Sequence, residues 1–533
     1  MTELPVIYSE EEKVWSGPPR STIYKEDTSL GRIIFHTMRN WPKNVCLICD
    51  ITGVSLTFEQ VLTWAIRIAQ SFRKRLLNHK NIIGIAAKNS TYVMPLVVAC
   101  LMNGTPFHAV SPVLDEATLK HMFSITKPKL IFCDGNVWQK IHAATIDWRP
   151  EIFIITGKVE GVLSIESLLD YTDDENIYQP EPLAEGGNQT VVILCSSGTT
   201  GLPKAICLSN NEVLPMPMAN SESVIYTASG LDWTSGLAAY IIAAALGSTM
   251  ICSSNPLTPE YFVHLMKKYK ITHTSLAPWY LSAICSCPEA TAGDLKSLRK
   301  LFFTGGAISS ATGEKLKDLF RNAVICASYG LTETGTISMS FDSRNCLTAG
   351  RPFTGVRVKI IDETNRNLGP NEVGEICVQV GNHWNGYFGN SEATQNVLDS
   401  EGWFHTGDLG YLDDQHLLHI VDRKKAVLKY LGYQYWTFEI EKVISELPGV
   451  QDVCVVGIYD ERVGDAAGAL VVRTKGSNIK EQEITEHVGK RLPPIRKQLH
   501  SGVQFTDHLP ANLNGKVDRK AAREEFLAKK ELI

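Results

Sequence analysis

Short apolar runs alternate with helical patterns over most of the first 340 residues, and this limits the possible folds more than any other feature. An apolar helix is predicted over 91–103. Strands are predicted at 82–87, 129–133, 152–155, 271–277 and 301–304. Strands that alternate with helices form parallel sheets covered by helices. The sequence therefore predicts the α/β class.

The chain has 533 residues, too many for one hydrophobic core, so two or more domains are expected. Between about 350 and 420 the pattern changes to short β runs separated by turns, which predicts a small β-barrel-like region. A second unit follows, with helices predicted over 437–447 and 480–491 and strands over 452–458 and 468–473. We predict a large N-terminal domain over 1–422 and a small α+β C-terminal domain over 423–533.

A strand followed by a loop of hydroxyls and glycines, closed by a lysine, carries the strongest functional signal. The apolar run 190–195 leads into Ser196-Ser-Gly-Thr-Thr-Gly-Leu-Pro-Lys204. Glycines let backbone N–H groups approach a phosphate, and a lysine adds a positive charge. The spacing G-x-x-G-x-x-K differs from that of a P-loop. Taken alone, the loop is equally compatible with an ordinary polar turn.

This loop and further segments, in the same order, resemble the signature of the adenylate-forming superfamily. That superfamily contains acyl-CoA synthetases, 4-coumarate–CoA ligases, firefly luciferase-like enzymes and the adenylation domains of peptide synthetases. The further segments are Tyr329-Gly-Leu-Thr-Glu-Thr334, Gly402-Trp-Phe-His-Thr-Gly-Asp408, Asp422-Arg-Lys-Lys425, Lys429-Tyr-Leu-Gly-Tyr-Gln434 and Asn514-Gly-Lys-Val-Asp-Arg519. The resemblance covers nearly the whole chain and is greatest to luciferase-like fatty acyl-CoA synthetases.

The resemblance implies a nucleotide site in the large domain. Thr332 would donate to the α-phosphate of ATP, and Glu333 would bind Mg²⁺, which prefers oxygen ligands. Asp408 would accept both ribose hydroxyls, assisted by Arg423. The phosphate-binding residues would be Ser196, Ser197, Gly198, Thr199, Thr200, Gly201 and Lys204, and adenine would contact Tyr329, Gly330, Gly305, Gly306 and Ala307.

The resemblance also implies that the small domain rotates about a hinge at Lys425. Lys516 would steady the carboxylate and the α-phosphate while the adenylate forms. Lys429 and Gly432 would face the site after rotation, when coenzyme A attacks. A charged turn or a lysine near a chain end is by itself usually solvated, so these roles depend on the motifs.

The activity implied is that of an ATP-dependent acid–thiol ligase, an AMP-forming acyl-CoA synthetase. A medium- or long-chain fatty acid would become acyl-AMP and then the thioester of coenzyme A. An arylacrylic-acid ligase of the 4-coumarate type and a luciferase-like monooxygenase are the alternatives among enzymes. A catalytically silent nucleotide-binding homologue is the alternative from another class.

The chain departs from the family pattern at two places. Trp233 stands where luciferases and many ligases have a histidine, and a tryptophan cannot relay a proton. It is expected to shape the acyl pocket, to block the channel for pantetheine, or only to pack. Ala511-Asn512 replaces the basic residue that often follows the Leu-Pro of the terminal motif. Both departures concern the thioester step more than adenylation.

Composition limits the partners and the compartment. A net charge of −5 gives no reason to expect nucleic-acid binding. Thirteen scattered cysteines show no disulfide framework, and Cys46 and Cys49 are expected in a core strand rather than a metal site. The uncharged stretch 235–252 is expected to be a buried helix and then a strand, not a transmembrane segment. Without an S-K-L-type C-terminus, a cytoplasmic location is expected, and the sequence does not indicate the oligomeric state.

Overall fold

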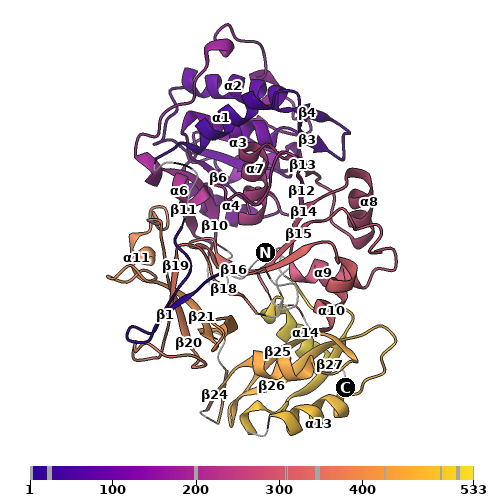
Figure 1. The fold of residues 1–533 in the computed structure, drawn as a ribbon. Helices are drawn as coiled ribbons and strands as arrows, with labels where there is room; N and C mark the ends of the chain where they lie inside the picture. Colours follow the sequence, from indigo (N-terminus) through magenta and orange to yellow (C-terminus); the bar gives the residue numbers. More distant parts are fainter. Residues whose placement is uncertain are drawn as a thin grey trace.

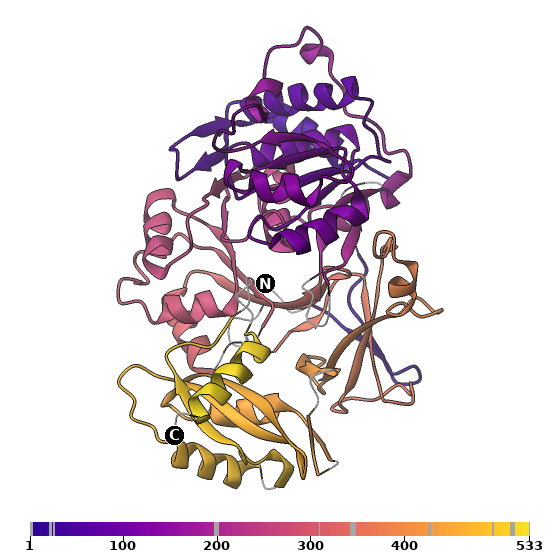
Figure 2. The ribbon, with the colours of Figure 1, turned by 180° about the vertical axis from the view of Figure 1, so that it is seen from behind.

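The computed structural model describes residues 4–20, 24, 27–196, 202–306, 308, 310–341, 348–424, 428–431, 433–492, 495–511 and 517–531. In these residues, the chain up to Arg423 forms three sheets, and the chain from Leu428 onward forms a fourth. Figures 1 and 2 show this fourth sheet and its helices as a unit at the lower end of the molecule. The predicted fold class is confirmed, a large α/β part and a small α+β part.

A seven-stranded sheet lies in the upper part of Figure 1, in the order β11-β10-β6-β5-β7-β8-β9. Its strands are β5 (Ile83–Ala86), β6 (Phe107–Ala109), β7 (Leu130–Cys133), β8 (Glu151–Ile154), β9 (Leu163–Ser164), β10 (Thr190–Cys195) and β11 (Ala205–Ser209). Neighbouring strands are parallel except β10 and β11, which are antiparallel. The three strands predicted between 82 and 155 are β5, β7 and β8.

A nine-stranded sheet has the order β18-β17-β16-β15-β14-β12-β13-β3-β4. Its strands are β3 (Val45–Cys49), β4 (Ser55–Thr57), β12 (Val224–Thr227), β13 (Thr249–Cys252), β14 (His273–Leu276), β15 (Lys300–Thr304), β16 (Val324–Leu331), β17 (Gly335–Ser340) and β18 (Arg351–Pro352). From β16 to β3 the strands are parallel, and antiparallel strands form both edges. Cys46 and Cys49 are buried on β3, as expected.

Helices cover these two sheets, and one hydrophobic core contains side chains from both. Every residue of α3 is buried, which explains why all of its residues before Asn103 are apolar. The helices are α1 (Leu30–Asn40), α2 (Phe58–Lys74), α3 (Val93–Asn103), α4 (Glu116–Thr126), α5 (Trp138–Ala144), α6 (Asn210–Val213), α7 (Thr234–Leu246), α8 (Pro259–Tyr269), α9 (Pro278–Cys285) and α10 (Ser310–Leu319). The stretch 235–252 consists of α7 and β13, as predicted. In the described part of the chain, no helix is long and apolar enough to cross a membrane.

The third sheet is the predicted small β region, and all its neighbouring strands are antiparallel. Its order is β1-β2-β19-β20-β21-β22. The strands are β1 (Ile7–Ser9), β2 (Val14–Ser16), β19 (Val356–Ile361), β20 (Gly374–Val380), β21 (Phe404–Leu412) and β22 (Leu418–Arg423), and the short helix α11 (Ser391–Gln395) lies between β20 and β21 in sequence. The N-terminal hairpin β1–β2 was not predicted from the sequence.

The fourth sheet has β26 between β23 and β25, and β27 also pairs with β26. Its strands are β23 (Leu428–Tyr430), β24 (Tyr433–Tyr435), β25 (Val450–Asp460), β26 (Gly464–Arg473) and β27 (Gly502–Thr506). Its helices are α12 (Thr437–Ile444), α13 (Glu481–Arg491) and α14 (Arg519–Glu531). The two predicted helices and two predicted strands are α12, α13, β25 and β26, whereas β27 and α14 were missed.

The connection between the large and small parts begins at the end of β22. Asp422 accepts a hydrogen bond from the Thr437 hydroxyl at the start of α12 (2.8 Å). The predicted boundary between residues 422 and 423 falls inside β22, and the boundary stays a prediction. The predicted hinge residue, Lys425, lies outside the described residues.

Helix α14 is attached to the small unit through Phe526, which is fully buried. Its ring lies against Gly468 of β26, where a Cβ atom would approach it to 2.5 Å. We expect Phe526→Ala to destabilise the small unit by about 3–5 kcal/mol, because the removed ring leaves a cavity. The loss is measured by chemical denaturation, with limited proteolysis of the C-terminal part reporting the unfolding of the small unit. Glu524→Ala, on the exposed side of α14, is the control and should change stability by less than about 0.5 kcal/mol.

Candidate functional site

The predicted phosphate loop begins and ends on the antiparallel pair β10–β11. The backbone N–H of Ser196 donates to the Lys204 carbonyl (2.8 Å), and the N–H of Lys204 donates to the Ser196 hydroxyl (2.8 Å). These two bonds close the base of the loop. The predicted phosphate-binding residues 197–201 lie outside the described residues. The ammonium of Lys204 lies 4.5 Å from the centre of the Tyr387 ring.

The segment Tyr329–Thr334 forms the end of β16 and the turn into β17. Gly330 is required there, because a Cβ atom would lie 2.2 Å from the Gly335 carbonyl oxygen. The Thr332 hydroxyl lies 3.4 Å from the Thr234 hydroxyl at the start of α7. Glu333 accepts a hydrogen bond from the Tyr387 hydroxyl (2.8 Å). Thr332 and Glu333 therefore stand in a strand-to-strand turn, next to the residues that begin α7.

Asp408 is a buried carboxylate, 5% exposed, with a protein partner on each oxygen. The Tyr329 hydroxyl donates to Oδ2 (2.8 Å), and the Arg423 guanidinium lies 2.9 Å from Oδ1. Asp408 and Arg423 are direct partners across β21 and β22. Burial and the charge of Asp408 raise the pKa of Tyr329 well above its ordinary value, so the phenol remains a donor. The three predicted nucleotide-binding residues are thus brought together.

Thr406 and Gly407, the two residues before Asp408, form a local irregularity in β21. The pairing of β21 with β20 shifts here, and Gly407 has a positive φ of 68°. The Thr406 hydroxyl donates to the Ile376 carbonyl (2.7 Å) and accepts the N–H of Asp408 (3.1 Å). The irregularity is therefore held by the threonine, and it turns Asp408 toward Tyr329.

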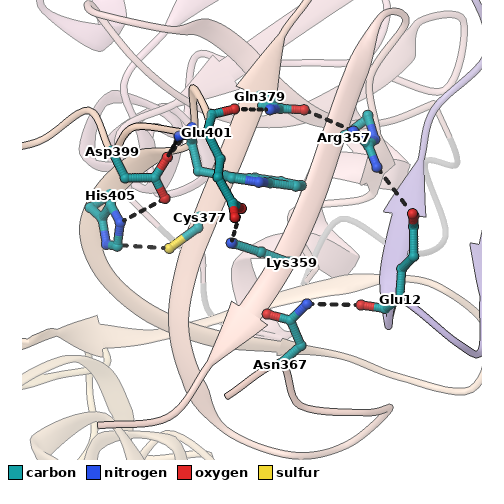
Figure 3. Close-up of polar contacts among 10 residues, drawn as sticks. Glu12, Arg357, Lys359, Asn367, Cys377, Gln379, Asp399, Glu401 and His405 are labelled. Carbon is teal, nitrogen blue, oxygen red and sulfur yellow. Dashed lines mark hydrogen bonds and ion pairs between the residues drawn. The ribbon is translucent and has the colours of Figure 1, made fainter. Parts of the chain in front are cut away.

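Figure 3 shows polar contacts around the loop that precedes β21 and the start of that strand. The cations of Lys359 and Arg357 lie 4.5 and 5.4 Å from the Trp403 ring. His405 lies between Asp399 (3.5 Å) and Cys377 (3.5 Å), as Figure 3 shows. These contacts give Trp403 and His405 of the motif a role in packing, while Asp408 supplies the polar group at the site.

Two residues that contact the site were not identified from the sequence. Tyr387 contacts both Lys204 and Glu333, as described above. Glu375 accepts the N–H of Gly407 (3.3 Å) and pairs with Lys424 (2.7 Å). Neither lies in a motif with a phosphate- or metal-binding pattern, so only its position in the folded chain identifies it.

Gly305 and Gly306 follow β15, and Gly305 has a positive φ of 90°. A Cβ atom on Gly306 would lie 3.5 Å from Pro278, the first residue of α9. The two glycines therefore form a close turn against α9, and Ala307 lies outside the described residues.

The remaining predicted residues belong to the small unit. Lys429 is on β23, where its N–H donates to Asp465 (3.0 Å) and its side chain is exposed. In the part of the chain that the structure describes, no contact joins Lys429 to Glu333 or Asp408. Gly432 and Lys516 are outside that part. The structure thus joins Asp408 to Tyr329 and Arg423, and Lys204 to Glu333 through Tyr387, whereas Lys429 has no contact with these groups.

Trp233 precedes α7 in a tight loop. The N–H of Trp233 donates to the Gly230 carbonyl (3.2 Å), and a Cβ atom on Gly236 would lie 1.8 Å from that oxygen. Neighbouring Asp232 has its pKa raised from 3.8 to about 6 by burial, although bonds from Ser111 and Trp233 oppose this shift. The loop therefore puts a tryptophan and a carboxyl with a raised pKa directly before α7.

No group of three or more His, Cys, Asp or Glu side chains among the described residues could hold a metal ion. Glu333 nevertheless fits Mg²⁺, because a single carboxylate beside a phosphate site suffices when water and phosphate oxygens complete the shell. Its Oε1 has a donor in Tyr387.

Comparison with known proteins connects this geometry to a family. The AMP-binding enzyme family matches residues 34–388, and the AMP-binding enzyme C-terminal domain matches residues 439–516. The chain is 28% identical to luciferin 4-monooxygenase of Photuris pensylvanica over 497 residues, 89% of this chain and 90% of the relative. It is also 28% identical to 4-coumarate–CoA ligase 1 of Petroselinum crispum over 497 residues, 90% of each chain.

Solved structures share the fold. ATP-bound MatB from Rhodopseudomonas palustris superposes with a TM-score of 0.84 at 22% identity, covering 94% of this chain and 99% of MatB. A benzoate CoA ligase from Burkholderia xenovorans superposes with a TM-score of 0.81 at 19% identity, covering 93% of this chain and all of the ligase.

The raised pKa of Asp232 predicts a pH-dependent stability. Its unfolded value is near 3.8 and its folded value about 6, so its stabilising contribution is complete below about pH 4 and is lost as the pH rises through 6. Two pKa units correspond to about 3 kcal/mol. We expect the melting temperature of Asp232→Asn, relative to wild type, to increase between about pH 4 and 7. Exposed Asp173→Asn is the control, and a constant difference for Asp232→Asn would contradict the raised pKa.

Proposed function

The chain belongs to the AMP-binding enzyme family, whose members form adenylates, and we propose that it is an ATP-dependent acid–thiol ligase acting on a medium- or long-chain fatty acid. Its relatives place it among acyl- or aryl-CoA ligases and luciferase-like enzymes. The observation that carries the proposal is that side chains from three sheets meet: Tyr387 contacts both Lys204 and Glu333, and Tyr329, four residues before Glu333, binds Asp408. Ligands of open α/β sheets bind beyond the carboxyl ends of the parallel strands, and Glu333 follows the parallel strand β16.

The proposed reaction has two steps. The carboxylate attacks the α-phosphorus of ATP, which forms acyl-AMP and releases pyrophosphate. The sulfur of coenzyme A then attacks the acyl carbon, the thiol proton is released, and AMP leaves. The first step makes a poor electrophile reactive, and its catalysis depends on positioning and on stabilising charge.

The described residues fit the first step. Asp408 would hold the ribose, since a buried carboxylate kept in place by Tyr329 and Arg423 is a rigid acceptor. Lys204 would bind the terminal phosphates, and Thr332 would donate to the α-phosphate. Bound through Glu333, Mg²⁺ would supply positive charge that offsets the charge of the phosphates.

The acyl group is proposed to lie beside α7. This helix carries no charged side chain. Its first residue, Thr234, directly follows Trp233 and contacts Thr332. An apolar wall suits a fatty acid, and the absence of the histidine found in many relatives distinguishes this wall from theirs. Two alternatives must be tested against a fatty acid substrate. The 4-coumarate–CoA ligase relative suggests an aryl acid, and the luciferin 4-monooxygenase relative suggests an oxygen-dependent reaction.

The proposed ligase activity is tested by measuring AMP release from the purified protein with a panel of fatty and aryl acids, each with and without coenzyme A. We expect coenzyme A-dependent AMP with fatty acids of a limited range of chain length. Release only with arylacrylic acids would identify the other ligase class, and light with luciferin would identify a luciferase-like reaction. ATP binding with no turnover of any acid would establish a silent homologue and refute the proposal.

Substitutions of Lys516 and Lys429 test whether the two lysines act in different half-reactions. Lys516→Ala should abolish acyl-AMP formation but spare thioester formation from supplied acyl-AMP, because its charge acts on the α-phosphate. Lys429→Ala should have the opposite effect, since Lys429 would reach the site only after rotation. Each half-reaction is measured separately, by pyrophosphate release and by thioester formation. Equal losses in both steps for both variants would contradict this division.

A further inference from the structure

Tyr387 contacts both charged groups of the proposed phosphate site with one side chain. It lies between β20 and α11 and is 7% exposed. Its hydroxyl donates to Oε1 of Glu333 (2.8 Å). Its ring centre lies 4.5 Å from the ammonium of Lys204. A cation over an aromatic face and a phenol bonded to a carboxylate are both favourable contacts.

The backbone around Tyr387 is fixed to the strand that follows the phosphate loop. Tyr387 forms a bridge with Ile206, and the N–H of Phe388 donates to the Ala205 carbonyl (2.8 Å). On the other side, the N–H of Tyr387 donates to the Thr394 hydroxyl (3.0 Å). The ring of Trp384 meets the Tyr387 ring edge to face at 5.0 Å. The phenol therefore has a defined position relative to Lys204.

One side chain contacts groups of opposite charge: the Lys204 ammonium lies over the ring, and the hydroxyl binds Glu333. No ion pair joins Lys204 to Glu333 in the part of the chain that the structure describes. A lysine and a glutamate on flexible side chains attract each other when nothing else holds them, and here each has a contact with Tyr387 instead. Burial and the charge of Glu333 raise the pKa of Tyr387 far above its ordinary value, so the hydroxyl stays a donor.

We propose that Tyr387 is a positioning residue that keeps Lys204 and Glu333 apart and leaves one carboxylate oxygen of Glu333 available to the divalent cation. The ring holds the lysine for the phosphates, and the hydroxyl occupies Oε1. This inference rests on the proposed function in one respect, namely that Lys204 and Glu333 bind a nucleotide and its cation. A carboxylate restricted to one oxygen suits Mg²⁺, which demands near-octahedral geometry, better than Ca²⁺, which accepts both oxygens.

Two substitutions separate the hydroxyl from the ring. Tyr387→Phe removes the bond to Glu333 and keeps the aromatic face, whereas Tyr387→Leu removes both. Isothermal titration calorimetry measures ATP affinity without any acid, once in EDTA and once in excess Mg²⁺. For Tyr387→Phe we expect unchanged affinity in EDTA and a gain from Mg²⁺ reduced about tenfold, the effect of losing a hydrogen bond to a charged group. For Tyr387→Leu, affinity should also fall about threefold or more in EDTA, because the cation–π contact is lost.

Metal choice gives a second readout. With Oε1 freed, Tyr387→Phe should favour Ca²⁺ over Mg²⁺ in supporting ATP binding, relative to wild type. Tyr269→Phe is the matched control, because its hydroxyl donates to another carboxylate, that of Asp50 (2.7 Å). This control should leave both affinities and the metal preference unchanged.

The outcomes are distinct. Wild-type affinities in Tyr387→Phe, or equal losses in Tyr387→Phe and Tyr387→Leu with and without metal, would overturn the positioning role. A wild-type protein that binds no ATP would overturn it as well. If the wild type binds ATP with Mg²⁺ dependence but releases no AMP with any acid, the ligase proposal fails, while the role of Tyr387 still stands or falls by its own variants.

Discussion

The charge of Asp408 is the constraint on which the arrangement of the large part depends. A carboxylate that is only 5% exposed is costly unless it is paired and hydrogen-bonded. Its partners come from two sheets: Tyr329 from the end of β16, and Arg423 from the last residue of β22. Satisfying this one charge therefore fixes the antiparallel region against the parallel sheet. The same contacts leave a preorganised acceptor where the family resemblance puts the ribose.

Three consecutive residues, 422–424, make the contacts at the junction between the large part and the small unit. Asp422 accepts the hydroxyl of Thr437, Arg423 pairs with Asp408, and Lys424 pairs with Glu375. Two of these contacts point back into the large part, and one points forward into α12. The chain is thus anchored up to Lys424, and any rotation about the predicted hinge at Lys425 would leave the pairing of Arg423 with Asp408 in place.

The sequence predicted the features that local patterns encode. Apolar alternation gave the parallel strands, and the uncharged stretch 235–252 gave a buried helix and a strand. It missed α14, because Ala522 and Phe526 are the only buried ones among the side chains of that helix that the structure describes, too few for a clear apolar stripe. It missed the hairpin β1–β2, since Trp15 pairs with Val358, more than 300 residues away. Tyr387 was missed for the same reason: its role requires contacts with Lys204 and Glu333 that no spacing in the sequence reveals.

The position of Lys429 bears on how two chemical steps can share one site. Its exposed side chain has no described contact with the residues around Asp408, so the arrangement seen is not the one in which Lys429 faces a bound adenylate. In a rotation of the kind that the family resemblance implies, the hydrogen bond between Thr437 and Asp422 would break or move, at a net cost of about 1 kcal/mol. The contacts inside each part are far more numerous, with separate hydrophobic cores on either side. Rotation of intact units is therefore less costly than rearranging either core. The site of the large part can stay assembled while the proposed rotation replaces Lys516 by Lys429 beside it.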